Sequence, residues 1–204
     1  MDLTDALFAA LALDSGSGSF RADAQARTVE LAAGPGTDLI SDPVSGKLTH
    51  TAPVLSAPAP EGDFVFSAEV IVSGPRTTYD AGALALYAGQ TSWAKLCFEY
   101  SPDAEAMAVG VVTRGSSDDA NGDVVASDRL FLRISRLGEA VAFHHSPDGV
   151  RWRFVRVFRW DQPEELAGLR LGFVAQSPLG EGRDVTFSKV SCRAARLADL
   201  RDGS

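Results

Sequence analysis

The segment from Ser92 to Tyr100 is the first place where this sequence could do chemistry. Successive side chains of a β-strand point to opposite faces, so an extended segment would place Trp93, Lys95 and Glu99 on one face. Lysine donates hydrogen bonds, glutamate accepts them, and a tryptophan ring stacks on the apolar face of a sugar. This face therefore predicts a binding site for a carbohydrate or a similar polyol.

Three residues from other segments are expected to join this face: Thr113, Asp118 and Arg133. A carboxylate beside a cation has a lowered pKa, whereas the acid of a hydrolase needs a raised one. Lys95 shares the face of Glu99, and we expect Arg114 and Arg133 to lie within reach from neighbouring strands. We therefore predict an ionised Glu99 at neutral pH and no hydrolase activity.

Metal and cofactor sites are not indicated. The run from Asp118 to Asp123 is rich in oxygen ligands of the kind Ca²⁺ prefers, but its glycine comes one position early for a helix-loop-helix calcium site, and the glutamate at the twelfth position is missing. A solvated acidic loop is the favoured interpretation. The adjacent His144 and His145 point to opposite faces of a strand and cannot both bind one zinc ion.

Composition restricts the partners and the location. The chain of 204 residues carries 27 acidic and 19 basic residues, a net charge of −8, so it lacks the positive field that nucleic acid or an anionic membrane would require. No segment approaches the ~18 apolar residues of a membrane-spanning helix. Cys97 and Cys192 suit free, buried thiols. We expect a soluble cytoplasmic protein.

Alternation with a period of two dominates residues 28–191 and is typical of antiparallel strands. It predicts an all-β fold, a sandwich of two antiparallel sheets that face each other across one core. The predicted strands are 28–33, 47–51, 63–73, 82–88, 92–100, 106–113, 129–135, 140–145, 152–158, 170–176 and 183–191. The side chains expected between the sheets are Leu84, Leu86, Leu96, Phe98, Tyr100, Leu130, Leu132 and Ile134.

The whole chain, residues 1–204, is expected to form a single domain with its core at about residues 28–191. Residues 1–19 predict a short helix, capped by Thr4, followed by a Gly/Ser linker. A helical turn is predicted at residues 162–167, where a proline stands near the start. Residues 193–204 form a polar tail.

The order of several short motifs resembles a family of unknown function. The motifs are Tyr79-Asp80-Ala81-Gly82, Trp93-Ala94-Lys95, Glu99-Tyr100-Ser101, Val111-Val112-Thr113-Arg114 and Gln176-Ser177-Pro178. The best-named member of that family is a fungal protein described as a regulator of enolase. The resemblance implies the concanavalin A-like jelly-roll fold.

Two other functions remain open. A glycosidase needs two carboxylates about 5–9 Å apart, but the Glu-x-Asp-x-x-Glu spacing that glucanases of this fold typically supply is absent. Alternatively, the resemblance implies a regulator that binds a glycolytic enzyme through an apolar patch, which we expect around Trp152, Phe158 and Trp160. A non-catalytic carbohydrate-binding module is the leading hypothesis, because Lys95 and Glu99 lie beside Trp93.

Overall fold

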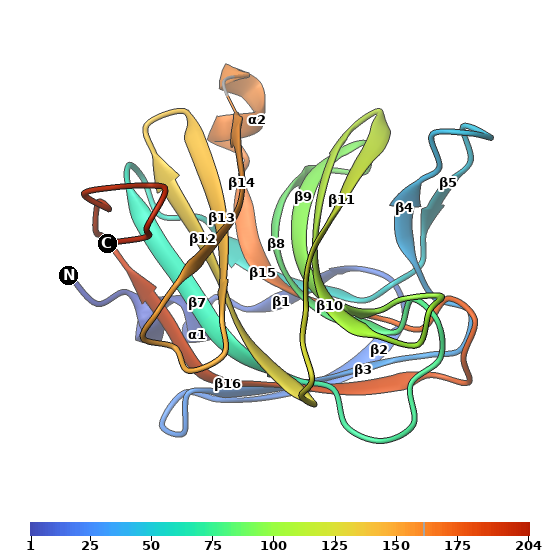
Figure 1. Cartoon of the computed structure of the whole chain (residues 1–204). Helices are drawn as coiled ribbons and strands as arrows, with labels where there is room; N and C mark the ends of the chain where they lie inside the picture. Colours follow the sequence, from blue (N-terminus) through green and yellow to red (C-terminus); the bar gives the residue numbers. More distant parts are fainter. Residues whose placement is uncertain (161) are drawn as a thin grey trace.

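The computed structural model describes residues 1–160 and 162–204 and folds them into two facing antiparallel sheets (Figure 1). The first sheet has the order β1-β6-β15-β8-β9-β10-β11. Its strands are β1 (Ala12–Ser15), β6 (Val54–Pro58), β15 (Arg170–Gln176), β8 (Ala81–Gly89), β9 (Ser92–Tyr100), β10 (Ala106–Arg114) and β11 (Ser116–Val124).

The second sheet has the order β14-β13-β12-β7-β16-β3-β2. Its strands are β14 (Arg153–Arg159), β13 (Ala140–Ser146), β12 (Arg129–Leu137), β7 (Phe64–Ile71), β16 (Arg183–Arg193), β3 (Thr28–Ala33) and β2 (Gly18–Asp23). The predicted all-β sandwich of two antiparallel sheets is therefore confirmed.

Three smaller elements complete the fold. Strands β4 (Leu39–Ser41) and β5 (Leu48–His50) form a hairpin that stands across from β9, β10 and β11, on the side away from the second sheet (Figure 1). The helices are α1 (Thr4–Ala9) and α2 (Pro163–Ala167), the latter at the predicted helical turn. Among the described residues, no helix is long and apolar enough to span a membrane.

Aromatic and aliphatic side chains fill the space between the sheets. Phe66, Phe173 and Phe187 are fully buried there. The ring centroid of Phe173 lies 5.5 Å from that of Phe66 and 4.8 Å from that of Phe187. Of the predicted core residues, seven are at most 1% exposed: Leu84, Leu86, Leu96, Phe98, Leu130, Leu132 and Ile134. Tyr100 is only partly buried, because it ends β9 at the rim of the sandwich.

The sequence did not reveal the strands without apolar alternation. Residues 12–15 form β1 and residues 18–23 form β2, although residues 1–19 were predicted as a short helix and a linker. The predicted acidic loop forms edge strand β11. Edge strands are often polar and charged, which protects them from pairing with other chains. Thr4 does not cap α1: it is the first helical residue, and its hydroxyl donates to Asp2 Oδ1 at 2.6 Å.

Ion pairs join two edge strands that belong to different sheets. Arg156 of β14 pairs with Asp118 of β11 at 2.8 Å, and Arg153 pairs with Asp123 at 2.7 Å. The charged side chains of both edges are thus used within the fold.

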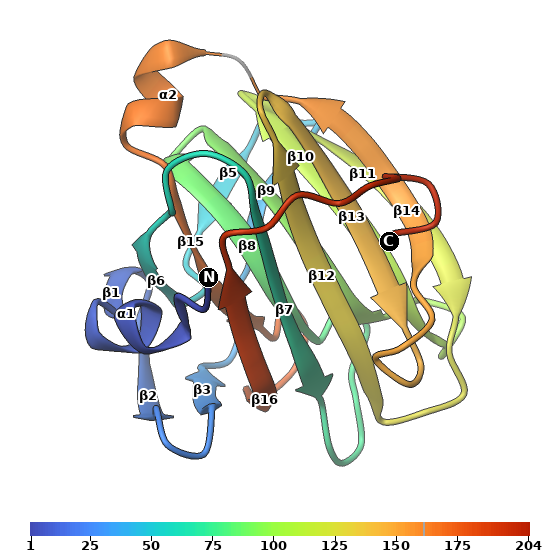
Figure 2. The same cartoon turned by 90° about the vertical axis from the view of Figure 1, so that its left-hand side faces the viewer.

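The chain after β16 passes in front of β12 and β13, on the outer face of the second sheet (Figure 2).

Candidate functional site

The outer face of the first sheet, which points away from the second sheet, carries Lys95 and Glu99. Two cross-strand rows position them: Lys95 lies opposite Val111 of β10, which lies opposite Asp119 of β11. Glu99 lies opposite Ala81 of β8, which lies opposite Gln176 of β15. The sheet therefore brings together residues that are far apart in sequence.

A cavity of about 260 Å³ lies between this face and the start of the β4–β5 hairpin. We call it the Lys95 cavity. Its lining residues are Asp38, Ile40, Tyr79, Lys95, Glu99, Val111, Asp119 and Gln176. Ligand pockets typically measure roughly 300–1,000 Å³, so this cavity is slightly smaller than that range.

Lys95 is the buried charged group of the cavity, at 3% exposed. Its Nζ donates to Gln176 Oε1 at 2.7 Å, and Gln176 Nε2 donates to the Tyr79 carbonyl at 3.0 Å. Burial opposes the lysine charge, but Cys97 and the carboxyl groups of Asp38, Glu99 and Asp119 raise the pKa of Lys95 above its ordinary value. Lys95 is therefore an ammonium ion.

The surroundings of Glu99 favour its neutral form, whereas those of Lys95 favour its charged form. Burial raises its pKa to about 7; Lys95 opposes this increase, and the nearby carboxyl groups of Asp38 and Asp119 reinforce it. The prediction of a lowered pKa is wrong, because it left out the burial of Glu99 and placed two arginines beside it. Glu99 is about half protonated at neutral pH and can donate or accept a hydrogen bond.

A strained corner holds the rim of the cavity. Tyr79 has a left-handed backbone with φ of 69°, which is costly for a bulky residue. The neighbouring Asp80 is fully buried and fixes this corner, since it accepts hydrogen bonds from Arg183 Nη2 at 2.6 Å and from Ser177 Oγ at 2.7 Å. Tyr79 is 41% exposed and is the aromatic residue among those that line the cavity.

Trp93 shares the face but not the cavity. It is fully buried beneath the β4–β5 hairpin, where the ring of His50 lies 5.9 Å away. The predicted stacking of Trp93 on a sugar ring is therefore wrong, because the sequence does not show that a distant hairpin covers this end of β9.

Thr113 is also fully buried, and its hydroxyl hydrogen-bonds Ser117 Oγ at 2.8 Å. The same Ser117 oxygen accepts the backbone N–H of Ser41, in β4, at 3.0 Å. Thr113 thus anchors the hairpin that forms one wall of the cavity and does not line it.

The two predicted arginines lie elsewhere. Arg133 is in β12, which pairs with β7 and β13 of the second sheet, so its placement beside Glu99 is wrong. Its guanidinium stacks over Trp152 at 4.1 Å and donates to the Gly203 carbonyl at 2.5 Å. Arg114 donates to the Arg159 carbonyl. The strand order, which the sequence does not give, decided both positions.

The acidic residue of β11 that lines the cavity is Asp119 and not Asp118. The Asp118 carboxylate pairs with Arg156, toward the second sheet, whereas the next side chain lies on the opposite face. Alternation along an edge strand decides between them, and the prediction of a loop at this segment carried no such alternation. Asp38, Tyr79 and Gln176 were also missed, although Tyr79 and Gln176 stand in the motifs that carried the family resemblance.

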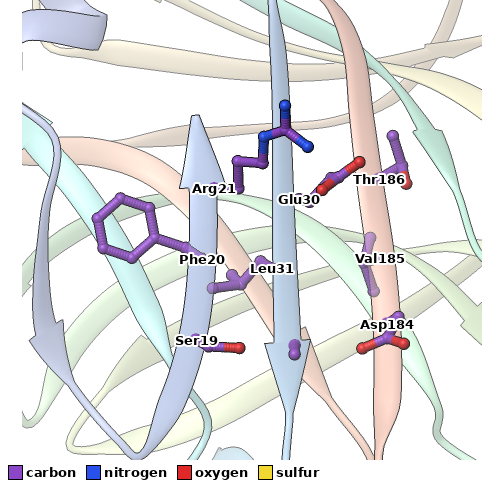
Figure 3. A pocket seen from close by; sticks show the side chains of 9 residues that line it. Ser19, Phe20, Arg21, Glu30, Leu31, Asp184, Val185 and Thr186 are labelled. Atoms are coloured by element: carbon purple, nitrogen blue, oxygen red, sulfur yellow. The ribbon is translucent and has the colours of Figure 1, made fainter. Parts of the chain in front are cut away.

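A second hollow, of about 420 Å³, lies on the outer face of the second sheet. Figure 3 shows that its side chains come from three neighbouring strands, with Arg21, Glu30 and Thr186 in one row. The three side chains of this row are exposed or half-buried. No buried charge is aimed into this hollow from the residues that line it, so the Lys95 cavity is the stronger candidate.

The expected protein-binding patch is not a surface patch. Trp160 is 2% exposed, and Phe158 and Trp152 are partly buried. Phe158 packs edge-on against the core ring of Phe143. The prediction of an exposed aromatic patch is therefore wrong, because alternation along a strand does not show which face another element covers.

No group of three or more His, Cys, Asp or Glu side chains within residues 1–160 and 162–204 is arranged to hold a metal ion. Cys97 and Cys192 are free and buried, as predicted. Burial raises the pKa of both thiols, so neither is a reactive thiolate at neutral pH.

The fold and the cavity define a jelly-roll β-sandwich with a polar cavity on one outer face. The chain belongs to DUF1349, a protein family of unknown function whose model matches residues 19–195. The predicted resemblance to a family of unknown function is thereby confirmed, and the relation to a fungal regulator of enolase stays a prediction. No curated protein sequence matches the chain.

Solved structures show the same fold. A functionally unknown protein from Saccharomyces cerevisiae has a TM-score of 0.80 at 22% identity, covering 93% of this chain and 98% of that one. A xylan β-1,4-xylosidase from Bacillus halodurans C-125 has a TM-score of 0.66 at 11% identity, and the match covers 81% of this chain but 32% of the enzyme. The CBM2 module of the evolved Dit of Lactobacillus casei BL23 phage J-1 has a TM-score of 0.55 at 13% identity, covering 90% and 89%.

Proposed function

We propose that this protein is a binding module that takes up a small polyhydroxylated molecule, a carbohydrate or polyol, in the Lys95 cavity. The observation that carries this proposal is the buried ammonium of Lys95, fixed by Gln176 and surrounded by carboxyl groups at a cavity open to ligand. Hydroxyl groups both donate and accept hydrogen bonds, so such a ligand can accept from the ammonium group and donate to the carboxyl groups at once.

The geometry of the cavity supports a ligand of about one sugar ring. Val111 and Ile40 provide apolar surface, and Tyr79, an exposed residue of the lining, offers an aromatic ring that can cover the apolar face of a sugar. Tyr79 takes the stacking role predicted for Trp93. Some solved chains of the same fold belong to carbohydrate-processing enzymes, which is consistent with the proposal but bears on the fold alone.

Binding can be tested by saturation-transfer NMR with a panel of monosaccharides and sugar alcohols. We expect signals from at least one probe, lost in Lys95→Met and retained in the matched control Lys189→Met, whose lysine is 65% exposed on the second sheet. A panel without any signal, or signals that persist in Lys95→Met, would overturn the proposal.

A second candidate function is glycoside hydrolysis, favoured by the pKa of about 7 for Glu99. A protonated glutamate with carboxylates nearby is the arrangement that a general acid requires. Against it, Lys95 lies among these carboxylates. Release of nitrophenol from a panel of nitrophenyl glycosides decides between the functions: we expect none, and turnover that disappears in Glu99→Gln would establish the enzyme instead.

A further inference from the structure

The charges that line the Lys95 cavity do not balance. Three carboxyl groups, from Asp38, Glu99 and Asp119, face one ammonium group, that of Lys95. With all four ionised, the lining carries two more negative than positive charges. A ligand in this cavity therefore meets three carboxyl groups and a single buried cation.

Nearby arginines do not correct this imbalance. Arg183 is bound to the buried Asp80 at 2.6 Å, and Arg156 is bound to Asp118 at 2.8 Å. Arg114 donates to a backbone carbonyl of β14. Among the described residues that line the cavity, Lys95 is thus the sole cation, and its Nζ is held at Gln176.

The pKa values of the carboxyl groups in the cavity reflect the same lack of positive charge. Burial raises the pKa of Glu99 to about 7 against the opposing effect of Lys95, and Asp38 and Asp119 contribute in the same direction. Burial, Asp118 and Asp38 also raise the pKa of Asp119, and Lys95 and Arg156 oppose this. In the absence of a ligand, a proton on Glu99 supplies part of the missing positive charge.

We propose that the ligand of the Lys95 cavity is a hydroxylated molecule that carries a protonated amine, an amino sugar or an amino polyol. This inference rests on the proposed function and specifies its ligand class. The amine lies against Glu99 and Asp119, while Lys95 and Gln176 contact the hydroxyl groups. The same charges disfavour sugar acids and sugar phosphates, which would add an anion to three carboxylates.

The affinity for such a ligand depends on pH in a defined direction. The groups that face Glu99 are Lys95 and Cys97 of its own strand, Asp38 before β4 and Asp119 of β11. Glu99 is protonated at about pH 5 and about half ionised at about pH 7, which strengthens the attraction for an ammonium ion. Binding of an amine is therefore expected to tighten over this range, whereas binding of a neutral sugar changes little.

The test compares matched probes by isothermal titration calorimetry near pH 7, where such amines are largely protonated. Glucosamine, galactosamine and mannosamine are the cationic probes, glucose, galactose and mannose their neutral counterparts, and glucuronate the anionic one. We expect an amino sugar to bind at least about tenfold more tightly than its neutral counterpart, with no binding of glucuronate.

Neighbouring aspartates of β11 provide the matched variants. Asp119→Asn is expected to reduce the preference for the amine several-fold, and Asp118→Asn, whose carboxylate faces Arg156, is expected to leave it unchanged. Circular dichroism confirms that both variants fold.

The outcomes separate this inference from the proposed function. Neutral sugars that bind as tightly as amino sugars, or a preference that Asp119→Asn does not reduce, would overturn the inference and leave the proposed function standing. A complete absence of binding by every probe would overturn both.

Discussion

Two clusters of charged side chains lie close together in this protein and differ in one respect, the balance of their partners. Asp80 is fully buried and accepts four hydrogen bonds, from Thr77, Ser177 and twice from Arg183. The residue before Asp80, Tyr79, lines the Lys95 cavity. That cavity has three carboxyl groups for one ammonium group. Asp80 stands just before β8, and the Lys95 cavity lies on the outer face of the first sheet.

The difference teaches which cluster stabilises the fold and which is available for a ligand. A buried charge with all its partners fixes geometry, and removal of one partner leaves the other uncompensated. A cluster with surplus carboxylates reduces stability until a proton or a ligand cation neutralises it. The saturated cluster at Asp80 holds the strained Tyr79 in place, and thereby shapes the unsaturated one.

The largest expected effect is that of Asp80→Ala. It leaves the guanidinium of Arg183, 13% exposed, without its carboxylate, and we expect a loss of about 3–5 kcal/mol in the free energy of unfolding. Urea denaturation measures it. The matched control Asp128→Ala breaks an ion pair with Arg129 that is more than half exposed and is expected to change stability by less than about 0.5 kcal/mol. Equal effects of the two variants would remove the distinction between the clusters.

The second prediction concerns Glu99→Gln and has a pH-dependent sign. The unfolded chain loses the Glu99 proton near its ordinary pKa of 4.5, whereas the folded chain retains it up to about 7. The folded state thus binds more protons in this window, and the free energy of unfolding falls as pH rises through it.

Glutamine does not ionise, so the variant does not show this fall. We expect Glu99→Gln to be more stable than the parent chain by on the order of 2 kcal/mol at about pH 8, and similar to it at about pH 4. Urea denaturation across this range measures the difference. Parallel stability profiles for the two proteins would show that Glu99 is not destabilised by its neighbours.

The smallest expected effect sharpens the description of the saturated cluster. Ser177 is fully buried and donates to Asp80 Oδ1 at 2.7 Å, so Ser177→Ala is expected to cost about 1–2 kcal/mol in the free energy of unfolding. Ser45→Ala removes an exposed hydroxyl that donates to Asp42 and is expected to have almost no effect. Thermal unfolding of both variants would show whether every partner of Asp80 contributes.

Much of the fold followed from local patterns. The alternation from Ser92 to Tyr100 predicted β9 and put Lys95 and Glu99 on one face, because side-chain direction in a strand depends only on the period of two. The core side of β8, β9 and β12 followed in the same way. The polar edge strand β11 has no apolar alternation, so its register and the role of Asp119 were not predicted.

The sequence by itself determined the class of fold, the inward and outward faces of its apolar strands, and the presence of a lysine and a glutamate on the same face of one of them. The tertiary structure alone decided that β12 lies in the other sheet, that the β4–β5 hairpin covers Trp93, and that Asp38 and Asp119 approach Glu99. The physical reason is distance along the chain. Side-chain direction is a local property of the backbone, whereas strand order, coverage and the pKa of Glu99 depend on residues dozens of positions away.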